Sequence, residues 1–513
     1  MSRWLLQIAG ESRQVVPSCV VPSRTWSIPP VLGYTVPLST GGRNVAASAL
    51  DIDSLRAGHT PTRGEMAWMV LAMSAPAILA ELSTTLMQYI DAAMVGSLGA
   101  HATASIGIVE STIWLLDGLA GCMAAGFTVQ VAQLVGAGRD EDARNVFRQA
   151  IVVMLGIGIA LAVGGVAVSS RVPAWLGADT QLHADASRYF LVCSCAIVPL
   201  ALARLGTGML QCSGDMRTPS ALNVLSCVLD VCFNAVFLSG PEGIGLGPVT
   251  LPVPGLNLGV VGAALGTLCA QTVTAALLLW CACLRSERLA FRERGTWLPA
   301  ASTMRPAWAV SWPMLLERVV TSSAYVACTA IVAPLGVVAV AANSLAITAE
   351  AVCYMPGYGI ETAATTIVGQ VVGARRRDLA RSFARLATVL GMLVMTASGV
   401  VMFVLAPQIM AMLTPDVAVR ALGAQVLRIE AFAEPLFAAS MVVAGALRGA
   451  GDTLVPSIIS LASMWGVRIT LMAVLAPVWG LPGVWAAMAF ELCVRGALFL
   501  VRLLRDRWLD RVD

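Results

Sequence analysis

Long apolar stretches, separated by short polar segments, fill the chain from about residue 65 onward. A bilayer core about 30 Å thick needs roughly 20 apolar residues for each helical passage, and these stretches reach that length. The pattern therefore predicts an all-α membrane protein with twelve transmembrane helices. We expect their centres near Ala80, Leu115, Gly158, Val198, Val228, Ala270, Tyr325, Ala351, Met395, Ser440, Ile469 and Leu492.

The sequence of the first six predicted helices is partly repeated in the last six. Gln133-Leu-Val-Gly136 returns as Gln370-Val-Val-Gly373, an offset of 370 − 133 = 237. The same offset relates Pro76 to Pro313, Leu210 to Leu447, Asp215 to Asp452 and Pro219 to Pro456. Because six helices separate equivalent points, the halves should insert in the same orientation as two pseudo-symmetric six-helix lobes, with a substrate cleft between them.

The basic residues, all of them Arg, cluster in alternate connections between the predicted helices. By the positive-inside rule these connections and both termini are cytoplasmic, as an even number of helices requires. We therefore expect a multi-pass protein of the cell (inner or plasma) membrane. The clustered residues are Arg139, Arg144, Arg148, Arg217, Arg285, Arg288, Arg292, Arg294, Arg375, Arg376, Arg377, Arg381, Arg448, Arg502, Arg505, Arg507 and Arg511.

The segment 1–64 is rich in Pro, Ser and Arg and poor in acids. We interpret it as a disordered extension; an organellar transit peptide or an overcalled start codon would give the same composition. The expected divisions are a 1–64 extension, a 65–284 first lobe, a 285–305 cytoplasmic interlobe linker, a 306–505 second lobe and a 506–513 cytoplasmic tail.

The composition argues against a soluble enzyme. Hydrophobic residues make up 58% and charged residues 12%, whereas soluble domains have roughly 45–50% and 25%. The 13 Cys and three His follow no zinc or disulfide spacing, and hydrolase, metalloprotease and P-loop motifs are missing. We expect a monomeric secondary transporter whose partners are a small organic substrate and the lipid bilayer, with no nucleic acid, metal or cofactor beyond a coupling ion.

Several short segments recur in a characteristic order. They are Asp91 to Gly99, the two Gln-x-x-Gly-Ala segments, Gly214 to Pro219 and Gly262 to Thr267. Together they resemble the multidrug and toxin extrusion (MATE) family of cation-coupled antiporters, in its bacterial branch. The resemblance covers residues 65 to 504 and implies alternating access driven by H⁺ or Na⁺.

The resemblance implies a cation-coupling site at Asp91, which follows Pro76 on the same predicted helix at the spacing that the family shows. Asp230 and Asn234 are four residues apart and therefore share one face of their helix, and Thr267 on the next helix could complete a polar cluster. The family usually has Asn before the acid at this place. Because this chain has the two exchanged, the coordination is left open.

Acids of the second half form a second group of candidates. A charged side chain at the centre of a bilayer costs roughly 2.5–3.5 kcal/mol even on the milder insertion scales. An acid within a predicted helix is therefore a candidate for a functional site. The secondary cation or substrate candidates are Glu317, Glu350, Glu430 and Glu434. Asp91 maps to Cys328 under the repeat, which favours a main coupling site in the first lobe.

The repeat also makes Glu81 and Arg318 equivalent, since 81 + 237 = 318. We hypothesise an interlobe ion pair that latches one access state; the alternative is pairing within each lobe, Arg318 with Glu350. Four prolines are candidate hinges for the movement between access states, because proline bends a helix. They are Pro76, Pro313, Pro356 and Pro435.

The expected function is export of amphipathic, cationic organic compounds, coupled to H⁺ or Na⁺. Two alternatives remain: an exporter of organic anions, and a flippase of the wider superfamily that moves lipid-linked precursors. Such flippases usually carry more Arg in the cleft or additional helices. The sequence leaves the substrate and the choice between H⁺ and Na⁺ open.

Overall fold

The computed structural model describes residues 52–177, 179–238, 244–246, 249–251 and 255–509, and these residues are mainly helical. The first half comprises α1 Ile52–Arg56, α2 Arg63–Gly96, α3 Ala100–Gly136, α4 Asp140–Val168, α5 Val172–Trp175, α6 His183–Cys212, α7 Arg217–Leu238, the antiparallel strands β1 Ile244–Leu246 and β2 Val249–Leu251, α8 Gly259–Trp280 and η1 Cys281–Arg285. The second half comprises α9 Ala301–Val332, η2 Ala333–Leu335, α10 Val337–Gly373, α11 Arg377–Leu413, α12 Val417–Ala431, α13 Glu434–Gly449, α14 Leu454–Ser463, η3 Met464–Ile469, α15 Thr470–Trp479, α16 Leu481–Leu504 and η4 Arg507–Leu509.

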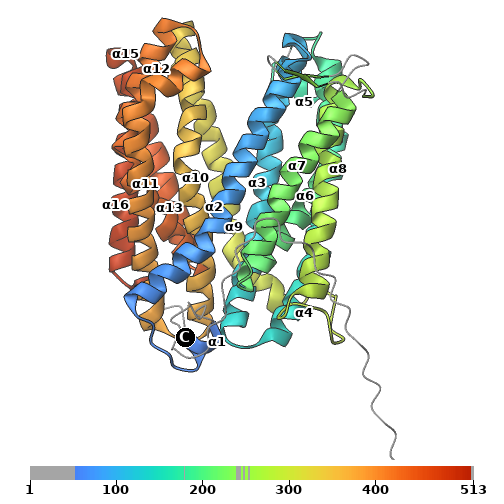
Figure 1. Cartoon of the computed structure of the whole chain (residues 1–513), viewed down its shortest axis with the longest axis vertical. Coiled ribbons are helices and arrows are strands. Elements are labelled where there is room, and N and C mark those ends of the chain that lie inside the picture. Colours follow the sequence, from blue (N-terminus) through green and yellow to red (C-terminus); the bar gives the residue numbers. More distant parts are fainter. Residues whose placement is uncertain (1–51, 178, 239–243, 247–248, 252–254, 510–513) are drawn as a thin grey trace, which may run out of the picture. The chain divides into compact units, whose positions relative to one another are not determined.

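Twelve passages can be traced along the described chain, as predicted. Eleven are single helical segments long and apolar enough to cross a membrane. The remaining passage is shared by α12 and α13, because the helix is interrupted at Phe432 and Ala433 and Pro435 stands in the first turn of α13. Figure 1 shows α5, α12 and α15 towards one end of the bundle and α1 at the other.

Local signals set several helix ends. Thr62 begins α2 with a capping box, in which its hydroxyl accepts from the Glu65 amide while its own amide donates to the Glu65 carboxylate. Gly99 and Gly336 close the turns before α3 and α10, with φ of 100° and 98°. Those values favour glycine, and the two positions are related by the repeat offset, since 99 + 237 = 336.

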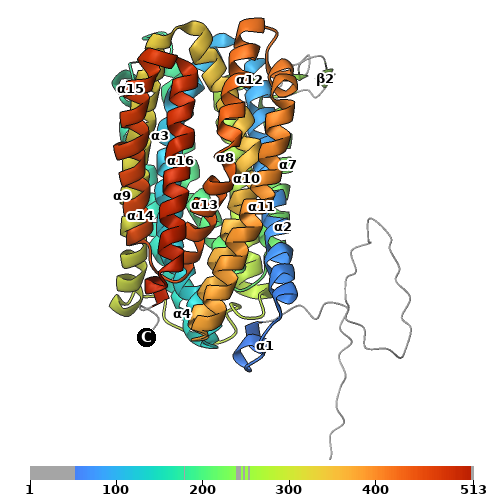
Figure 2. The same cartoon turned by 90° about the vertical axis from the view of Figure 1, so that its left-hand side faces the viewer.

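Two helices cross from one half to the other. In the first half α3, α4, α6, α7 and α8 pack together, and in the second half α10, α11, α13 and α16 do so. However, α2 packs extensively against α10, and α9 packs mainly against α3. Figure 2 faces the second half, with α16 and α11 in front and α9 at the edge. The lobes are therefore joined by an exchange of their first helices.

The duplicated Gln residues join the lobes at the end that carries the Arg-rich connections. Gln133 Nε2 donates to the carbonyl of Gly449 over 3.1 Å, and Gln370 Nε2 donates to the carbonyl of Cys212 over 2.9 Å. Both acceptors end a helix, and they too differ by 449 − 212 = 237 positions. The two hydrogen bonds are thus related by the pseudo-twofold axis.

Glycines in the same motif let α3 and α10 cross in contact. An ideal Cβ on Gly136 would lie 1.8 Å from the carbonyl oxygen of Gln370, and one on Gly373 would lie 1.9 Å from that of Gln133. Only glycine fits at such an approach. We call Gln133, Gly136, Gln370 and Gly373 the Gln–Gly clasp; it holds α3 and α10 together at the Arg-rich end of the bundle in this conformation.

The expected extent of the N-terminal extension is wrong for residues 52–64. Helix α1 buries Ile52 and Leu55 among side chains of α10 and α11, Arg288 donates to Asp53 over 2.7 Å, and Arg376 donates to the Leu55 carbonyl over 3.0 Å. One short helix thus contacts both halves beside the Gln–Gly clasp, because its two apolar side chains fill a hollow there. Residues 1–51 lie outside the described residues.

Two other boundaries also differ from expectation. Helix α9 begins at Ala301, inside the expected 285–305 linker. The expected 506–513 tail begins with η4, where Trp508 and Leu509 are buried in the same apolar cluster as α1. Both ends of the described chain therefore lie at the same end of the bundle, as an even number of passages requires.

Candidate cation and substrate sites

The first lobe contains a compact acid–amide site. Asn234 Nδ2, on α7, donates to Asp91 Oδ1 on α2 over 3.0 Å and to Asp230 Oδ2 one turn earlier over 3.1 Å. Asp230 and Asn234 are buried, with 2% and 3% of their surface exposed. Thr267 on α8 lies within reach of the Asp230 carboxyl. The four residues predicted from the sequence therefore come together, with Asn234 bridging the two acids.

Helix packing positions this bridge. An added Cβ at Gly266 would lie 1.9 Å from Asn234 Oδ1, so α8 can approach α7 only because residue 266 is glycine. Asp230 Oδ1 and Asn234 Oδ1 are buried without a hydrogen-bond donor among the described residues. Buried oxygens of this kind favour a bound proton or cation. The two carboxyl groups also lie close enough to interact directly, and two like charges at such a distance resist ionising together.

A second charged group of the first lobe was not foreseen. Arg204 on α6 donates from Nε and Nη2 to both carboxylate oxygens of Asp117 on α3, over 3.1 and 2.8 Å. This bidentate geometry is the strong form of an Arg–carboxylate pair. Glu81 on α2 lies close enough to Arg204 to interact electrostatically. Asp117 therefore has a structural partner, and Glu81 shares it.

The second lobe encloses a chamber of about 480 Å³. Aromatic side chains form part of its wall: Tyr354 meets Tyr358 and Phe437 edge-on, with ring centres 5.8 and 5.7 Å apart, and Tyr325 also lines the space. Such rings offer apolar contact area together with a polar tip. The charged lining residues are Glu317, Arg318, Glu350, Glu361, Arg448, Arg468 and Arg495.

Three of the four Arg residues of the chamber form ion pairs, two of them with the same glutamate. Arg448 pairs with Glu361 over 2.6 Å. Arg468, in the π-helical turn η3, pairs with Glu491 over 2.8 Å, and Arg495 reaches the other oxygen of Glu491 at 3.3 Å. Isolated π-helical turns are rare and often mark functional places. Arg468 and Glu491 thus form a buried ion pair.

Two glutamates lie deeper, where α12 gives way to α13. Glu430 and Glu434 are fully buried, and no described nitrogen or oxygen donor hydrogen-bonds to their carboxylate oxygens. The thiol of Cys353 lies beside Glu434, and Glu350 on α10 is close enough to repel both glutamates. Burying an unpaired charge is costly unless a proton or cation neutralises it. Three of the four candidate acids of the second half therefore form one cluster.

Glu317 does not join this cluster. Its carboxylate accepts a 2.7 Å hydrogen bond from the Ser457 hydroxyl on α14 and faces the chamber. Among the described residues, no group of three or more His, Cys, Asp or Glu side chains has a geometry that could hold a metal ion. The acids of the second half are thus split between the chamber wall and the buried cluster.

The sequence profile of the MatE family matches the chain twice, over residues 76–236 and 313–474. The two matches begin 313 − 76 = 237 residues apart, which is the offset of the internal repeat. Together they cover more than half of the chain. The chain belongs to the MatE family. It is a secondary transporter, as the sequence predicted, and not an enzyme.

Related MATE proteins align over most of their length. The probable multidrug resistance protein NorM of Thermotoga maritima is 24% identical over 445 residues, covering 86% of this chain and 93% of that protein. The NorM protein of Xanthomonas campestris pv. campestris is 27% identical over 454 residues, covering 84% and 92%.

Solved MATE structures show the same fold. The Vibrio cholerae MATE transporter VcmN matches with a TM-score of 0.79 at 17% identity, covering 86% of this chain and 97% of that one. A multidrug resistance MATE transporter of the MOP superfamily, solved in an outward-facing conformation, matches with a TM-score of 0.80 at 19% identity, covering 90% and 98%. The predicted two-lobe MATE fold is therefore confirmed.

The proposed latch of this MATE chain is not formed in the present conformation. Arg318 does cross to the first half, but its Nη2 donates to the backbone carbonyl of Trp114 over 3.1 Å, and its guanidinium lies against Gly118. Glu81 lies near Arg204 instead. The alternative pairing of Arg318 with Glu350 is not formed either, so the Glu81–Arg318 contact stays a prediction for another access state.

The four candidate hinge prolines differ in their setting. Pro76, Pro313 and Pro356 lie inside the continuous helices α2, α9 and α10. Pro435 instead starts a new helix after a break. Pro435 therefore marks a fixed interruption of the passage, whereas the other three retain the bent-helix setting that the hinge prediction requires.

Two residues that line the chamber were not predicted to do so from the sequence. Arg448 was assigned to a cytoplasmic connection but lies in α13 and lines the chamber, and Glu361, its partner on α10, was not considered. The pair could have been predicted because an acid and an Arg both lie within apolar stretches, and intramembrane charges usually pair.

Proposed function

We propose that this MATE protein is a proton-coupled antiporter that exports amphipathic organic cations, with Asp91, Asp230 and Asn234 as its coupling site. The observation that carries the proposal is the bridge of Asn234 between two carboxyl groups in a buried pocket. When both acids are charged, they repel each other and attract a cation. One bound proton removes the repulsion.

One residue of the proposed coupling site lies on a helix that joins the lobes. Asp91 is on α2, which packs against α10 of the second lobe, while Asp230 and Asn234 are on α7. A proton that changes the contact between α2 and α7 therefore acts on a helix shared by both lobes. We infer that protonation biases the opening of the cleft at one end, and that the Arg-rich end faces the cytoplasm.

The charges of the chamber favour a cationic substrate. Arg448 pairs with Glu361, and Arg468 and Arg495 share Glu491. Glu317 and Glu350 have no ion-pair partner in the described part of the chain. Arg318 is held at the Trp114 carbonyl. Tyr354 and its aromatic neighbours provide faces for cation–π contact. An aromatic cation therefore fits the chamber better than an anion.

The test is efflux of a fluorescent aromatic cation from proteoliposomes under an imposed pH gradient or an imposed sodium gradient. The unaltered chain should respond to the pH gradient, and Asp91→Asn should reduce efflux to the level of protein-free liposomes. Asp179→Asn is the matched control, because it makes the same change at an exposed residue of the α5–α6 connection. Size-exclusion profiles of both variants check folding.

Three results would overturn parts of the proposal. A response to the sodium gradient alone would replace the proton by Na⁺ as coupling ion. Retention of pH-driven efflux by Asp91→Asn would remove this site from coupling. Transport of an aromatic anion in place of the cation would overturn the assigned substrate class.

A further inference from the structure

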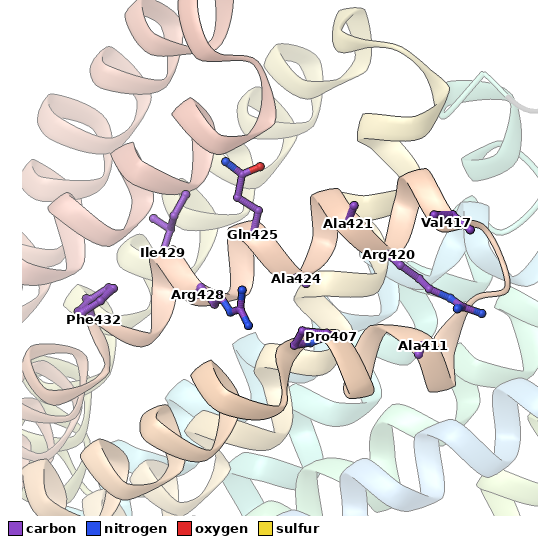
Figure 3. Close-up of a pocket in the computed structure, with 10 residues that line it drawn as sticks. All are labelled: Pro407, Ala411, Val417, Arg420, Ala421, Ala424, Gln425, Arg428, Ile429 and Phe432. Atoms are coloured by element: carbon purple, nitrogen blue, oxygen red, sulfur yellow. The ribbon is translucent and has the colours of Figure 1, made fainter.

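A groove of about 770 Å³ lies on the outer face of the second lobe, between the end of α11 and α12. Helix α12 is at the end of the bundle opposite α1, beside which the Gln–Gly clasp lies (Figure 1). The walls of the groove are mainly apolar, and two Arg side chains reach into it from α12 (Figure 3). The lining residues are Pro407, Ala411, Val417, Arg420, Ala421, Ala424, Gln425, Arg428, Ile429 and Phe432.

Neither Arg has an acidic partner. Arg420 Nε donates to the carbonyl of Thr414 over 2.7 Å, and Arg428 Nε donates to the carbonyl of Phe403 over 3.2 Å. The described residues provide no ion pair for either guanidinium. The nearby Asp416 is engaged in capping α12, where it accepts from two backbone amides. Both guanidinium groups thus keep their terminal nitrogens for another acceptor.

A backbone carbonyl of α11 that has no helical partner positions Arg428. Pro407 has no N–H, so it cannot bond the carbonyl four residues earlier, which is that of Phe403. That carbonyl is the one that accepts from Arg428. The guanidinium also lies 5.5 Å from the centre of the Phe403 ring, and Phe432 meets Phe403 edge-on at 5.5 Å. Arg428 is therefore held in place before any ligand arrives.

The surroundings are those of a membrane surface. Met412, Val417 and Phe432 are 87%, 75% and 75% exposed, and in a membrane protein we expect such apolar side chains to contact lipid. Arg420 and Arg428 are eight residues apart, about 12 Å along the helix axis, so one stands nearer the helix end and the other deeper. Arg428, the deeper of the two, needs a counter-charge, because the hydrocarbon around it provides no water to solvate its charge.

The pair of Arg residues on α12 has no equivalent in the first lobe. The repeat offset places His183 at the position of Arg420 (420 − 237 = 183) and Leu191 at that of Arg428 (428 − 237 = 191). The two positions on α6 therefore do not carry the Arg pair. A requirement of the common lobe architecture would be expected in both halves, so the pair belongs to this groove alone.

We propose that this groove binds one anionic phospholipid, with its phosphate and glycerol region along the stretch of α12 between Arg420 and Arg428 and an acyl chain continuing past Phe432. Charge complementarity selects an anion, and the lipid-facing apolar wall selects one with a hydrocarbon chain. Ala421 and Ala424, between the two Arg residues, leave room for the headgroup to lie against the helix. A free phosphate would reach only one of the two Arg residues and would leave this apolar wall uncovered.

The test is native mass spectrometry of the purified full-length protein titrated with phosphatidylglycerol or with phosphatidylcholine of the same acyl chains. The unaltered chain should retain one phosphatidylglycerol in preference to phosphatidylcholine. Each of Arg420→Gln and Arg428→Gln should weaken that binding roughly fivefold, as expected for a charge at a lipid headgroup. Arg428→Lys should restore much of it, and Pro407→Ala should weaken it by supplying a competing N–H for the Phe403 carbonyl.

Arg171→Gln is the matched control, because it removes an Arg at the same end of the first lobe and should leave lipid binding unchanged. Binding is scored only on the folded monomer peak, so a variant that misfolds is replaced by Arg428→Lys and Pro407→Ala. Equal retention of both lipids by the unaltered chain would overturn the proposal, as would an unchanged preference in the double Gln variant. Displacement of the lipid by inorganic phosphate alone, or a dimer that disappears in the double variant, would overturn it by assigning the groove to a soluble anion or a second copy.

Discussion

Replacing Gly136 by Ala tests whether the Gln–Gly clasp holds the Arg-rich end of the cleft closed. In the present conformation the new methyl group would lie 1.8 Å from the carbonyl oxygen of Gln370. Real Cβ atoms essentially never approach closer than 3.0 Å, so α3 and α10 must separate until this contact reaches that distance. Gly373→Ala should act equally, because its contact with Gln133 is the symmetry-related one.

That separation breaks more than one contact. The hydrogen bonds of Gln133 and Gln370 already measure 3.1 and 2.9 Å, so the same displacement of the helices would stretch both beyond hydrogen-bonding distance. Each contributes about 0.5–1.5 kcal/mol net, and forcing a methyl group into a packed contact costs about 1–3 kcal/mol. The closed conformation should therefore lose about 2–6 kcal/mol relative to the open one, a shift of roughly 30-fold or more.

Hydrogen exchange of the purified protein measures this shift directly. We expect Gly136→Ala to lower the protection of the backbone amides at the ends of α3 and α10, while the opposite end of the bundle becomes no less protected. Gly107→Ala is the matched control, since it lies on the same helix and its Cβ would meet nothing within 4 Å. Unchanged protection in Gly136→Ala would refute the reasoning, because the closed contact could not then be as tight as described.

Two further changes probe the second lobe and α1. Glu491→Leu should cost about 3–5 kcal/mol of folding stability, because it strands the buried Arg468; thermal unfolding in detergent measures this loss, and a change no larger than that of the exposed-site variant Arg139→Leu would contradict it. Partial burial of Asp53 acts to raise its pKa, but hydrogen bonds from Arg56 and Arg288 outweigh this and hold the pKa below its ordinary 3.8. Because the folded-state pKa is lowered, the contribution of Asp53 is present above pH 3.8 and lost only as pH falls through the folded value. Exchange protection of α1, corrected for intrinsic rates, should therefore stay constant from pH 5 to 8, and Asp53→Asn should lower it throughout.

Much of the fold could be predicted from the sequence, because the helices and the repeat are marked by patterns that extend over long segments. Twelve apolar stretches and one offset of 237 were enough for the helices, their order and their division into halves. The acid–amide site was also accessible, because Asp230 and Asn234 share a helix face by spacing alone and the family resemblance placed Asp91 with them. The bridge by Asn234 was not, since it depends on how closely α2 and α7 approach.

The features that were missed depend on contacts between distant segments. Helix α1 has only five residues, too few for a hydrophobic period, and its docking is set by Ile52 and Leu55 meeting α10 and α11. Arg204 and Arg448 lie in apolar stretches, where the sequence shows that a charge is present but does not show which acid pairs with it. Their acids lie 87 residues away in both cases, which no local pattern connects.

The outcome for Glu81 and Arg318 shows how an internal repeat can be used to predict contacts. A residue meets its own repeat equivalent only where both lie close to the pseudo-twofold axis, and Glu81 and Arg318 lie on α2 and α9, which pack against different neighbours, α10 and α3. A contact between non-equivalent positions has no such restriction, but symmetry requires it to occur twice.

The Gln–Gly clasp follows this second rule. Gln133 bonds the carbonyl of Gly449, and shifting both positions by 237 gives the bond of Gln370 to Cys212. A repeated polar residue followed three positions later by a repeated glycine thus indicates a crossed pair of contacts rather than a self-pair. On that reasoning, a duplicated Gln-x-x-Gly segment at the ends of equivalent helices predicts the closed end of the cleft, whereas a single pair of opposite charges at equivalent positions does not.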